Sequence, residues 1–154
     1  MSKIIINSYE ELDAFTGQQI GTSDYQKITQ EQINLFADAT LDHQWIHIDE
    51  ERAKKESPFG TTIAHGYLTV SLLAFHWNSL VEVRNVKLQV NYGIDKLKFG
   101  QAVKVNDEVR VHVYLESLTN LRGIAKANLK AIMEIKGEKK PAFETFVTFL
   151  YHFE

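Results

Sequence analysis

The chain contains no cysteine and only two prolines among its 154 residues. The lack of cysteine excludes disulfide bonds, thiolate-bound zinc, iron–sulfur clusters and a thiol nucleophile. The formal net charge of −3 provides no excess of positive charge for binding nucleic acid. The most apolar stretch, residues 63–83, is interrupted by His65, Gly66 and His76, which favours a buried helix over a membrane span. We therefore expect neither nucleic acid nor a membrane as a partner.

Composition and length are typical of a globular protein. Apolar residues make up 44% of the chain and charged residues 24%. The length predicts a single domain over residues 1–154. Residues 1–7 are too short and too soon polar for a signal peptide, so we expect a cytoplasmic protein.

The first half of the chain is predicted to be helical. Ser8, Thr29 and Asp49 are capping residues that predict the starts of three short helices, the last running through Lys55. Residues 41–48 have no regular period and predict an ordered loop. A longer helix, apolar on almost every side, is predicted over about residues 62–80, with Thr61 or Thr62 as its cap.

The second half of the chain alternates apolar and polar residues with a period of two. Four strands are predicted, at Val86–Tyr92, Val109–Leu115, Ala125–Ile135 and Phe143–Phe153. Short turns are predicted at Asn106–Asp107, Thr119–Asn120 and Gly137–Glu138. This pattern predicts an α+β fold in which an antiparallel sheet curls around the apolar helix. The last strand is apolar on both sides, which suggests an interface with a second copy.

The ionisable side chains concentrate in residues 42–49, which hold two His and two Asp. Asp42 and His47 are candidates for an acid/base pair, because a neutral imidazole can accept a proton at pH 7. Gly66 lies near the start of the apolar helix, where a backbone N–H has no helical partner and can stabilise an oxyanion. An acid/base pair and an oxyanion-stabilising N–H are the groups that a reaction at a carbonyl compound needs.

Other roles for these side chains were compared with the catalytic one. His43 and His47, together with Asp42 and Asp49, have side chains that bind metals, but no third His or Cys is placed to complete a site. We therefore expect no metal. His65 is interpreted mainly as a structural residue whose ring hydrogen-bonds a buried carbonyl and fixes the turn that follows it.

The pattern Asp42-x4-His47, followed by Ala64-His65-Gly66, resembles the signature of MaoC-like dehydratases, the (R)-specific enoyl-CoA hydratases of the hydratase-2 type. Residues 36–47, 58–66 and 91–93 are similar to the nodulation-protein-N branch of that family. Many members of the family have Asn and Pro where this chain has Gln44 and Trp45, a pair associated with the nodulation-type branch. The resemblance extends over nearly the whole chain.

The resemblance implies a hot-dog fold, in which a curved antiparallel sheet wraps a long central helix. It implies addition of water across the C2=C3 bond of a trans-2-enoyl thioester of coenzyme A or of acyl carrier protein, to give the (R)-3-hydroxyacyl product. Asp42 and His47 match the pair that activates the water, and Gly66 matches the glycine whose N–H binds the thioester oxygen. No bound cofactor is needed, because the thioester itself activates the alkene.

The same resemblance suggests the substrate contacts and the assembly. Gln44, Trp45, His65 and Tyr67 are expected to contact the substrate, and Lys98 to meet the phosphates of coenzyme A. A homodimer or a dimer of dimers is expected, with the active site near the interface. Two other functions remain open from the sequence: a hot-dog protein that binds acyl thioesters without catalysis, and a hot-dog thioesterase.

Overall fold

The computed structural model describes residues 2–154. The N-terminal third contains β1 (Ile4–Ile6), α1 (Tyr9–Asp13), β2 (Gln18–Thr22), β3 (Gln26–Lys27), α2 (Gln30–Thr40), α3 (Trp45–Ile48) and α4 (Glu50–Glu56). The middle contains α5 (Gly66–Ser71), α6 (Leu73–Leu80) and β4 (Val81–Val83). The remainder is four long strands, β5 (Val86–Phe99), β6 (Glu108–Leu121), β7 (Ile124–Ile135) and β8 (Phe143–Phe153).

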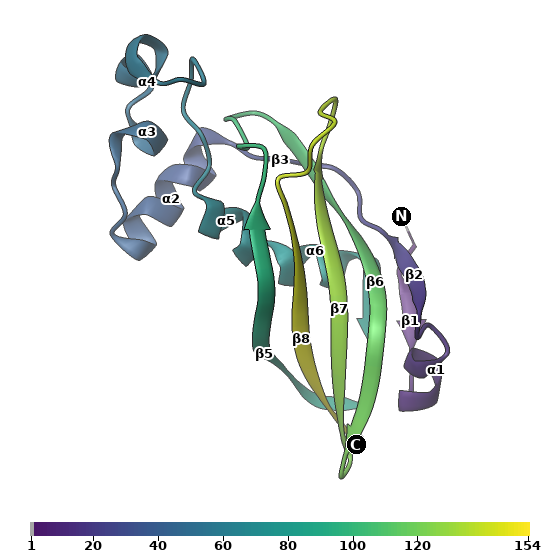
Figure 1. Ribbon diagram of the computed structural model, residues 1–154. Helices are drawn as coiled ribbons and strands as arrows, with labels where there is room; N and C mark the ends of the chain where they lie inside the picture. The colour runs from purple at the N-terminus through teal and green to yellow at the C-terminus, as the bar shows by residue number, and fades with distance from the viewer. Residues whose placement is uncertain (1) are drawn as a thin grey trace.

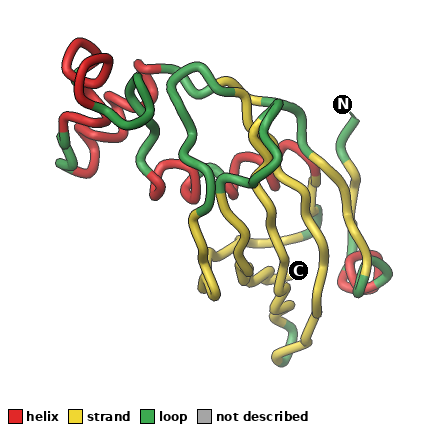
Figure 2. The backbone as a smooth tube through the Cα atoms, turned by 45° about the horizontal axis from the view of Figure 1, so that its top comes forward, coloured by secondary structure: helices red, strands yellow, loops and turns green. Residues whose placement is uncertain are grey.

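A curved antiparallel sheet forms the body of the protein. Its strand order is β2-β6-β7-β8-β5, and β3 also pairs with β6. Helices α5 and α6 lie behind the sheet, while α2, α3 and α4 form a group beyond one end of it (Figure 1). Figure 2 shows the same separation, with the helical group to one side of the strands. Strands β1 and β4 form a separate parallel pair.

The hydrophobic core lies between the sheet and the helices α5 and α6. In β7, residues alternate between buried and half-buried along the strand, as a sheet with one covered face requires. Its buried residues are Ala125, Ala127, Leu129, Ala131, Met133 and Ile135. Trp77 of α6 is buried against this face, and its Nε1–H donates to the Tyr151 hydroxyl at 2.5 Å. The predicted α+β arrangement is therefore observed.

The three predicted helix caps are present. The side-chain oxygens of Ser8, Thr29 and Asp49 accept the N–H of the third residue of α1, α2 and α4, respectively. Each cap satisfies a backbone donor that the first turn of a helix leaves without a partner. These contacts are local, which is why the sequence predicts them.

The prediction of one long helix over residues 62–80 is wrong about where the helix begins and about its continuity. Residues 62–64 are extended instead, because the Val105 N–H donates to the Thr62 carbonyl and the Ala64 N–H donates to the Val103 carbonyl. The helix begins at Gly66 and is interrupted at Leu72. The Thr69 hydroxyl donates to the Gly66 carbonyl at 2.6 Å, a competing bond of the kind that bends helices.

The helix is also not buried on every side. Tyr67, Ser71 and Phe75 lie on one exposed stripe of α5 and α6, at intervals of four residues. Tyr67 is 71% exposed and Phe75 is 53% exposed. One face of this mostly apolar pair of helices is therefore not covered by the sheet of the same chain.

Three predictions about the loops and strands also need correction. Residues 45–48 form the short helix α3 rather than a loop. The turn expected at Thr119–Asn120 lies instead after Leu121, where Arg122 and Gly123 both have positive φ, the conformation of a tight hairpin turn. Strand β8 lies inside the sheet, between β7 and β5, so the edge strands are β2 and β5 and not the last strand.

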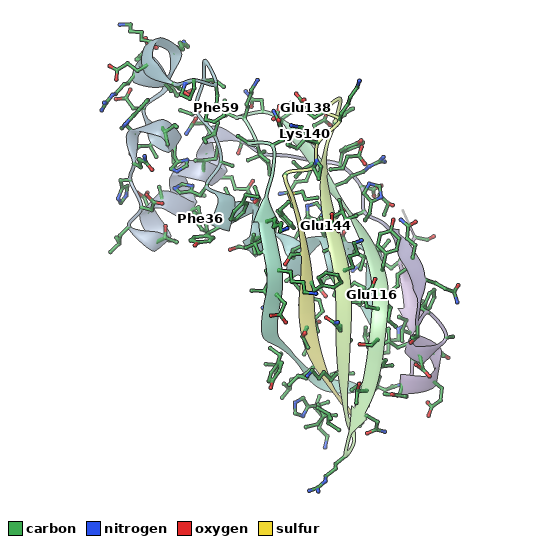
Figure 3. The ribbon with its side chains drawn as sticks, in the orientation of Figure 1. Phe36, Phe59, Glu116, Glu138, Lys140 and Glu144 are labelled. Atoms are coloured by element: carbon green, nitrogen blue, oxygen red, sulfur yellow. The ribbon has the colours of Figure 1, made fainter. Side chains whose placement is uncertain are left out.

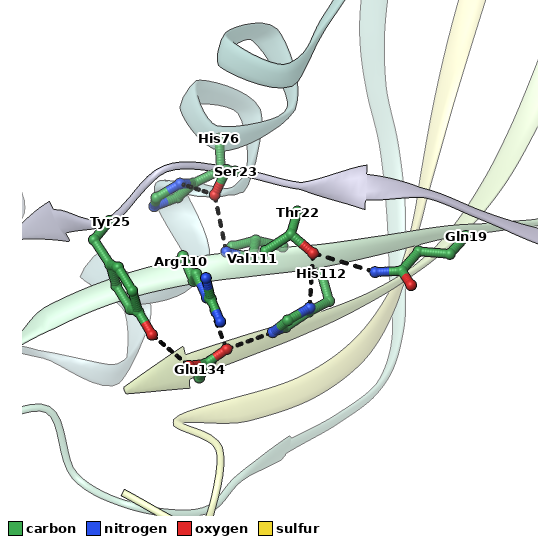
Figure 4. Close-up of polar contacts among 9 residues, drawn as sticks. All are labelled: Gln19, Thr22, Ser23, Tyr25, His76, Arg110, Val111, His112 and Glu134. Atoms are coloured by element: carbon green, nitrogen blue, oxygen red, sulfur yellow. Dashed lines mark hydrogen bonds and ion pairs between the residues drawn. The ribbon is translucent and has the colours of Figure 1, made fainter. Parts of the chain in front are cut away.

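A polar network on the outer face of the sheet holds Tyr25, the residue before β3 (Figure 4). The Glu134 carboxylate accepts hydrogen bonds from the Tyr25 hydroxyl at 2.5 Å, from Arg110 Nε at 2.8 Å and from His112 Nε2 at 2.6 Å. The Arg110 guanidinium holds the pKa of Glu134 down, at about 2. This network anchors the segment that leads into α2.

No helix within residues 2–154 combines the length and the apolar character that crossing a bilayer requires.

Candidate active site

Asp42 is placed by the end of α2. Leu41 has a φ of 63°, a left-handed conformation that stops the helix and turns the chain back. The Asp42 carboxylate follows this turn, is exposed, and accepts the Gln44 N–H in a long contact of 3.4 Å. The carboxylate is therefore held loosely at the rim of the helical group, where it can meet a ligand.

His47 is held firmly in the short helix α3. Its side chain is buried, and Nδ1 lies 2.7 Å from the Ile63 carbonyl oxygen. Because a carbonyl can only accept, Nδ1 carries the proton and Nε2 is left as a free acceptor. The His47 carbonyl accepts Gln30 Nε2 at 2.7 Å, and the Thr62 hydroxyl donates to Gln30 Oε1 at 2.5 Å. These contacts fasten α3 to α2 and to the extended segment before α5.

The environment of His47 favours its neutral form. Burial lowers its pKa below the ordinary value of 6.5, and the neighbouring His65 lowers it further. The hydrogen bond to the Ile63 carbonyl and the charge of Asp42 act in the opposite direction but do not reverse the shift. At pH 7 the His47 ring is therefore a neutral base with Nε2 available.

His65 and Gly66 lie at the start of α5. His65 is the residue before the helix, and Gly66 is its first residue. His65 Nε2 donates to the Asp42 carbonyl at 3.0 Å, and its ring stacks on the His47 ring with 3.8 Å between centroids. The Gly66 N–H makes no hydrogen bond to another residue in the range 2–154. It is therefore a free donor beside the two imidazoles.

These groups line one cavity of about 390 Å³. Asp42, His47, His65, Gly66 and Tyr67 all belong to its wall. One carboxylate oxygen of Asp42 and one ring nitrogen of each of the two histidines lie within 4.8 Å of one another. The structure therefore brings the predicted acid/base pair and the predicted glycine to the same cavity.

The rest of the cavity wall was not found from the sequence. It comes from Phe36 of α2, which points toward α5 (Figure 3), from Ile63, Ala64 and Thr69, and from Phe99, Gly100, Gln101, Ala102, Val103 and Ala142. Phe99 is the last residue of β5, which pairs with β8 over its whole length, and residues 100–103 follow it. The Val103 carbonyl accepts the Ala64 N–H beside the site. Nothing local in these residues marks them as part of a site.

The packing around Gly66 favours a residue without a Cβ atom. A Cβ atom at this position would lie 2.8 Å from Phe99 Cε1 and 2.9 Å from Phe99 Cζ, which is closer than carbon atoms pack. The glycine therefore allows the Phe99 ring to close against the start of α5. The sequence motif and the packing give independent reasons for glycine here.

Three of the expected substrate contacts lie outside this cavity. Gln44 is exposed and makes no capping hydrogen bond with its side chain, although it precedes α3. Trp45 faces α4, with the Arg52 guanidinium 4.3 Å from its ring centroid. Lys98 is exposed on β5, opposite Glu144 of β8. Among the expected contacts, His65 and Tyr67 are the two that line the cavity.

The structure supplies the third metal-binding group that the sequence did not offer, because His65 joins Asp42 and His47. The geometry of the two rings is unfavourable for sharing one ion. The ring planes of His47 and His65 are only 23° apart and stacked face to face. The lone pair of each nitrogen lies in its own ring plane, so two stacked rings do not direct their lone pairs at one point. The cluster suits hydrogen bonding to a small ligand better than it suits a metal.

Comparison with known proteins is consistent with this site. The model of the MaoC-like domain family matches residues 11–135. The 3-hydroxyacyl-thioester dehydratase Z of Mycobacterium tuberculosis is 46% identical over 136 residues, covering 88% of this chain and 89% of that protein. Nodulation protein N of Rhizobium leguminosarum bv. viciae is 41% identical over 138 residues, covering 88% and 85%.

The fold is shared with solved structures. The R-hydratase PhaJ1 of Pseudomonas aeruginosa superimposes with a TM-score of 0.73 at 19% identity, covering 90% of this chain and 83% of that one. The predicted hot-dog fold is thereby confirmed. The chain therefore belongs to the MaoC-like dehydratase family, and it is a hydro-lyase of that type.

Proposed function

We propose that the protein adds water across the C2=C3 bond of a trans-2-enoyl thioester, giving the (R)-3-hydroxyacyl thioester, and that it catalyses the reverse dehydration. The observation that supports this most directly is the shared cavity. Asp42, His47 and Gly66 all line this cavity, and Nδ1 of His47 is the ring nitrogen that bonds to the Ile63 carbonyl, which leaves Nε2 for a ligand. The relative named 3-hydroxyacyl-thioester dehydratase Z supports the same class of substrate.

The hydrogen-bonding state of His47 supports its role as the proton acceptor. Since Nδ1 donates to the Ile63 carbonyl, Nε2 can take a proton from a water molecule that Asp42 orients. The water oxygen bonds to C3 as its proton moves to His47. The proton then passes through Asp42 to C2, so both side chains return to their starting states and one water has been added.

The Gly66 N–H suits the negative charge that develops on the thioester oxygen. As the water oxygen bonds to C3, the C2=C3 electrons move toward the carbonyl and form an enolate. A fixed N–H at that oxygen stabilises the transition state more than the ground state, and loss of such a donor typically costs about 3–4 kcal/mol. No metal or organic cofactor takes part in this scheme.

The cavity wall suits an apolar acyl chain. Phe36, Ile63, Phe99 and Val103 contribute apolar side chains around the polar groups. The acyl group would occupy this space, and the carrier, coenzyme A or acyl carrier protein, would remain outside it. The contact of Lys98 with carrier phosphates, the single domain over residues 1–154 and the cytoplasmic location stay predictions.

We also propose that two copies pair along β5. One edge of this strand is bonded to β8, and the other has no strand partner within residues 2–154. Leu88, Tyr92, Ile94 and Phe99 of β5 are between 43% and 62% exposed. The exposed stripe of Tyr67 and Phe75 extends this apolar surface. A long apolar edge strand is a surface that proteins normally cover, and a second copy would cover it.

The function is tested with crotonyl-CoA, whose enoyl absorbance falls on hydration. We expect wild-type turnover to give the (R)-3-hydroxy product and D42N and H47A to lose activity by several orders of magnitude. Asparagine keeps the shape of Asp42 but carries no charge and cannot relay a proton. The matched controls are D38N and H43Q, since Asp38 and His43 are exposed and bond to each other outside the cavity.

The same assay separates the competing functions. Release of free thiol without loss of the enoyl group would indicate a thioesterase. Tight binding of enoyl-CoA with no turnover at any chain length would indicate a non-catalytic binding protein. Near-normal hydration by both D42N and H47A would show that these residues are not the catalytic pair.

A further inference from the structure

His65 contacts each of the three groups to which the proposed function assigns the chemistry. Its Nε2 donates to the main-chain carbonyl of Asp42 at 3.0 Å. Its ring stacks on His47 at 3.8 Å between centroids. It is also the residue bonded directly to Gly66 and the one that precedes α5. No other residue of the cavity wall has hydrogen-bond or ring contacts to both Asp42 and His47 among the interactions described for residues 2–154.

The hydrogen bond to Asp42 fixes the protonation pattern of His65. A carbonyl oxygen only accepts, so Nε2 carries the proton and Nδ1 is an acceptor. Nδ1 is buried and has no hydrogen-bond partner within residues 2–154. The side chain as a whole is only 3% exposed. A buried acceptor without a donor is unfavourable for folding, so packing alone does not explain a histidine here.

A phenylalanine would meet the packing requirement at this position. It would stack on His47 and would meet the Phe36 ring, whose centroid lies 4.9 Å from that of His65. It would also remove the unpartnered nitrogen. The feature that phenylalanine lacks is the N–H that holds Asp42, so the hydrogen bond is what histidine adds.

We propose that His65 is a positioning residue for the hydration reaction: its N–H fixes the main chain of Asp42 while its ring face fixes the plane of His47. The proposal rests on the proposed function and deepens it. The two catalytic side chains come from different elements, a loop after α2 and the helix α3, and the His65 ring is a rigid connection between them. Such a connection contributes to the reaction rate because it holds the reacting groups in position to within a fraction of an ångström.

His65 also acts on the charge state of His47. Two titratable groups face the His47 ring with an electrostatic effect: Asp42 from the preceding loop and His65 from the start of α5. The effect of His65 is to lower the pKa of His47, which supports a neutral base at pH 7.

Two substitutions separate the hydrogen bond from the ring. H65F keeps an aromatic ring on His47 but loses the N–H to Asp42. H65Q keeps an amide N–H near the same position but loses the stacked ring. H43Q is the control, because it makes the same chemical change at an exposed histidine outside the cavity.

We expect H65F to fold with an unchanged or higher melting temperature while kcat falls by about 10²-fold, the cost of misplacing reacting groups by about 1 Å. KM should change little. H65Q should recover part of the lost kcat, and H43Q should behave as wild type.

The outcomes distinguish this proposal from the proposed function. If wild type hydrates enoyl thioesters and H65F does so equally well, the positioning role is wrong and the proposed function stands. If wild type hydrates none of them, the proposed function fails and the positioning role fails with it. Nitrogen-15 spectra of the imidazoles give a check without turnover: His65 should be protonated at Nε2 and His47 at Nδ1, and the opposite form of His65 would overturn the proposal.

Discussion

Replacing Gly66 with alanine tests whether the start of α5 is shaped for catalysis. The new Cβ would lie 2.8 Å from Phe99 Cε1. Because carbon atoms pack at about 3.5–4.0 Å, the ring or the helix start must move by about 1 Å. Phe99 is 49% exposed, so its ring can swing aside at moderate cost to stability. The displaced N–H or ring should nevertheless lower kcat/KM for crotonyl-CoA by about 10²-fold.

The double variant G66A/F99A identifies the cause. With the ring removed, the added methyl has space, so G66A should cost much less activity in the F99A background than in wild type. The measurements are kcat/KM by loss of enoyl absorbance and the melting temperature of all four proteins. An equal cost of G66A in both backgrounds would refute the packing argument. A fully active G66A single variant would show that the close approach of Phe99 to Gly66 does not matter for activity.

Three further predictions concern pH and assembly. The pKa of His47 is lowered by burial, so the midpoint of the acid limb of kcat/KM should lie below pH 6.5; a midpoint above pH 6.5 would contradict this. His76 is buried against Ser23 (Figure 4) and its pKa is lowered from 6.5 to about 4 by burial. The unfolded chain therefore binds a proton before the folded one, and about 3 kcal/mol of stability present above pH 6.5 should be lost between pH 6.5 and 4. Urea unfolding should show this loss in wild type and not in H76Q. Substituting Ile94 with lysine on the β5 edge should convert a dimer to a monomer in light-scattering measurements, whereas the same change at exposed Leu35, outside that surface, should not.

The parts of the fold that depend on local contacts were predictable from the sequence. Ser8, Thr29 and Asp49 cap helices through side-chain contacts three residues away, and the alternation in β7 matches its buried face. The start of α5 was not predictable, because the Thr62 carbonyl pairs with Val105 from a distant segment. The competition between these bonds and a helix is decided by tertiary structure.

The candidate site shows the same division. Asp42, His47 and Gly66 were identified because they stand in a recognisable pattern, and the structure gathers them around one cavity. Trp45 is outside this cavity and lies against the Arg52 guanidinium of α4, so its contact with substrate stays a prediction. Phe99 lines the cavity through sheet pairing over long sequence distances, which no local motif records.

The most direct test of the account is the reaction of a trans-2-enoyl thioester in D2O, followed by NMR. The proposed mechanism predicts that wild type forms the (R)-3-hydroxyacyl thioester with a hydroxyl at C3 and one deuterium at C2, and that D42N and H47A form essentially none. A free thiol with an intact enoic acid, or an unchanged substrate under conditions in which the wild-type protein is folded, would contradict it.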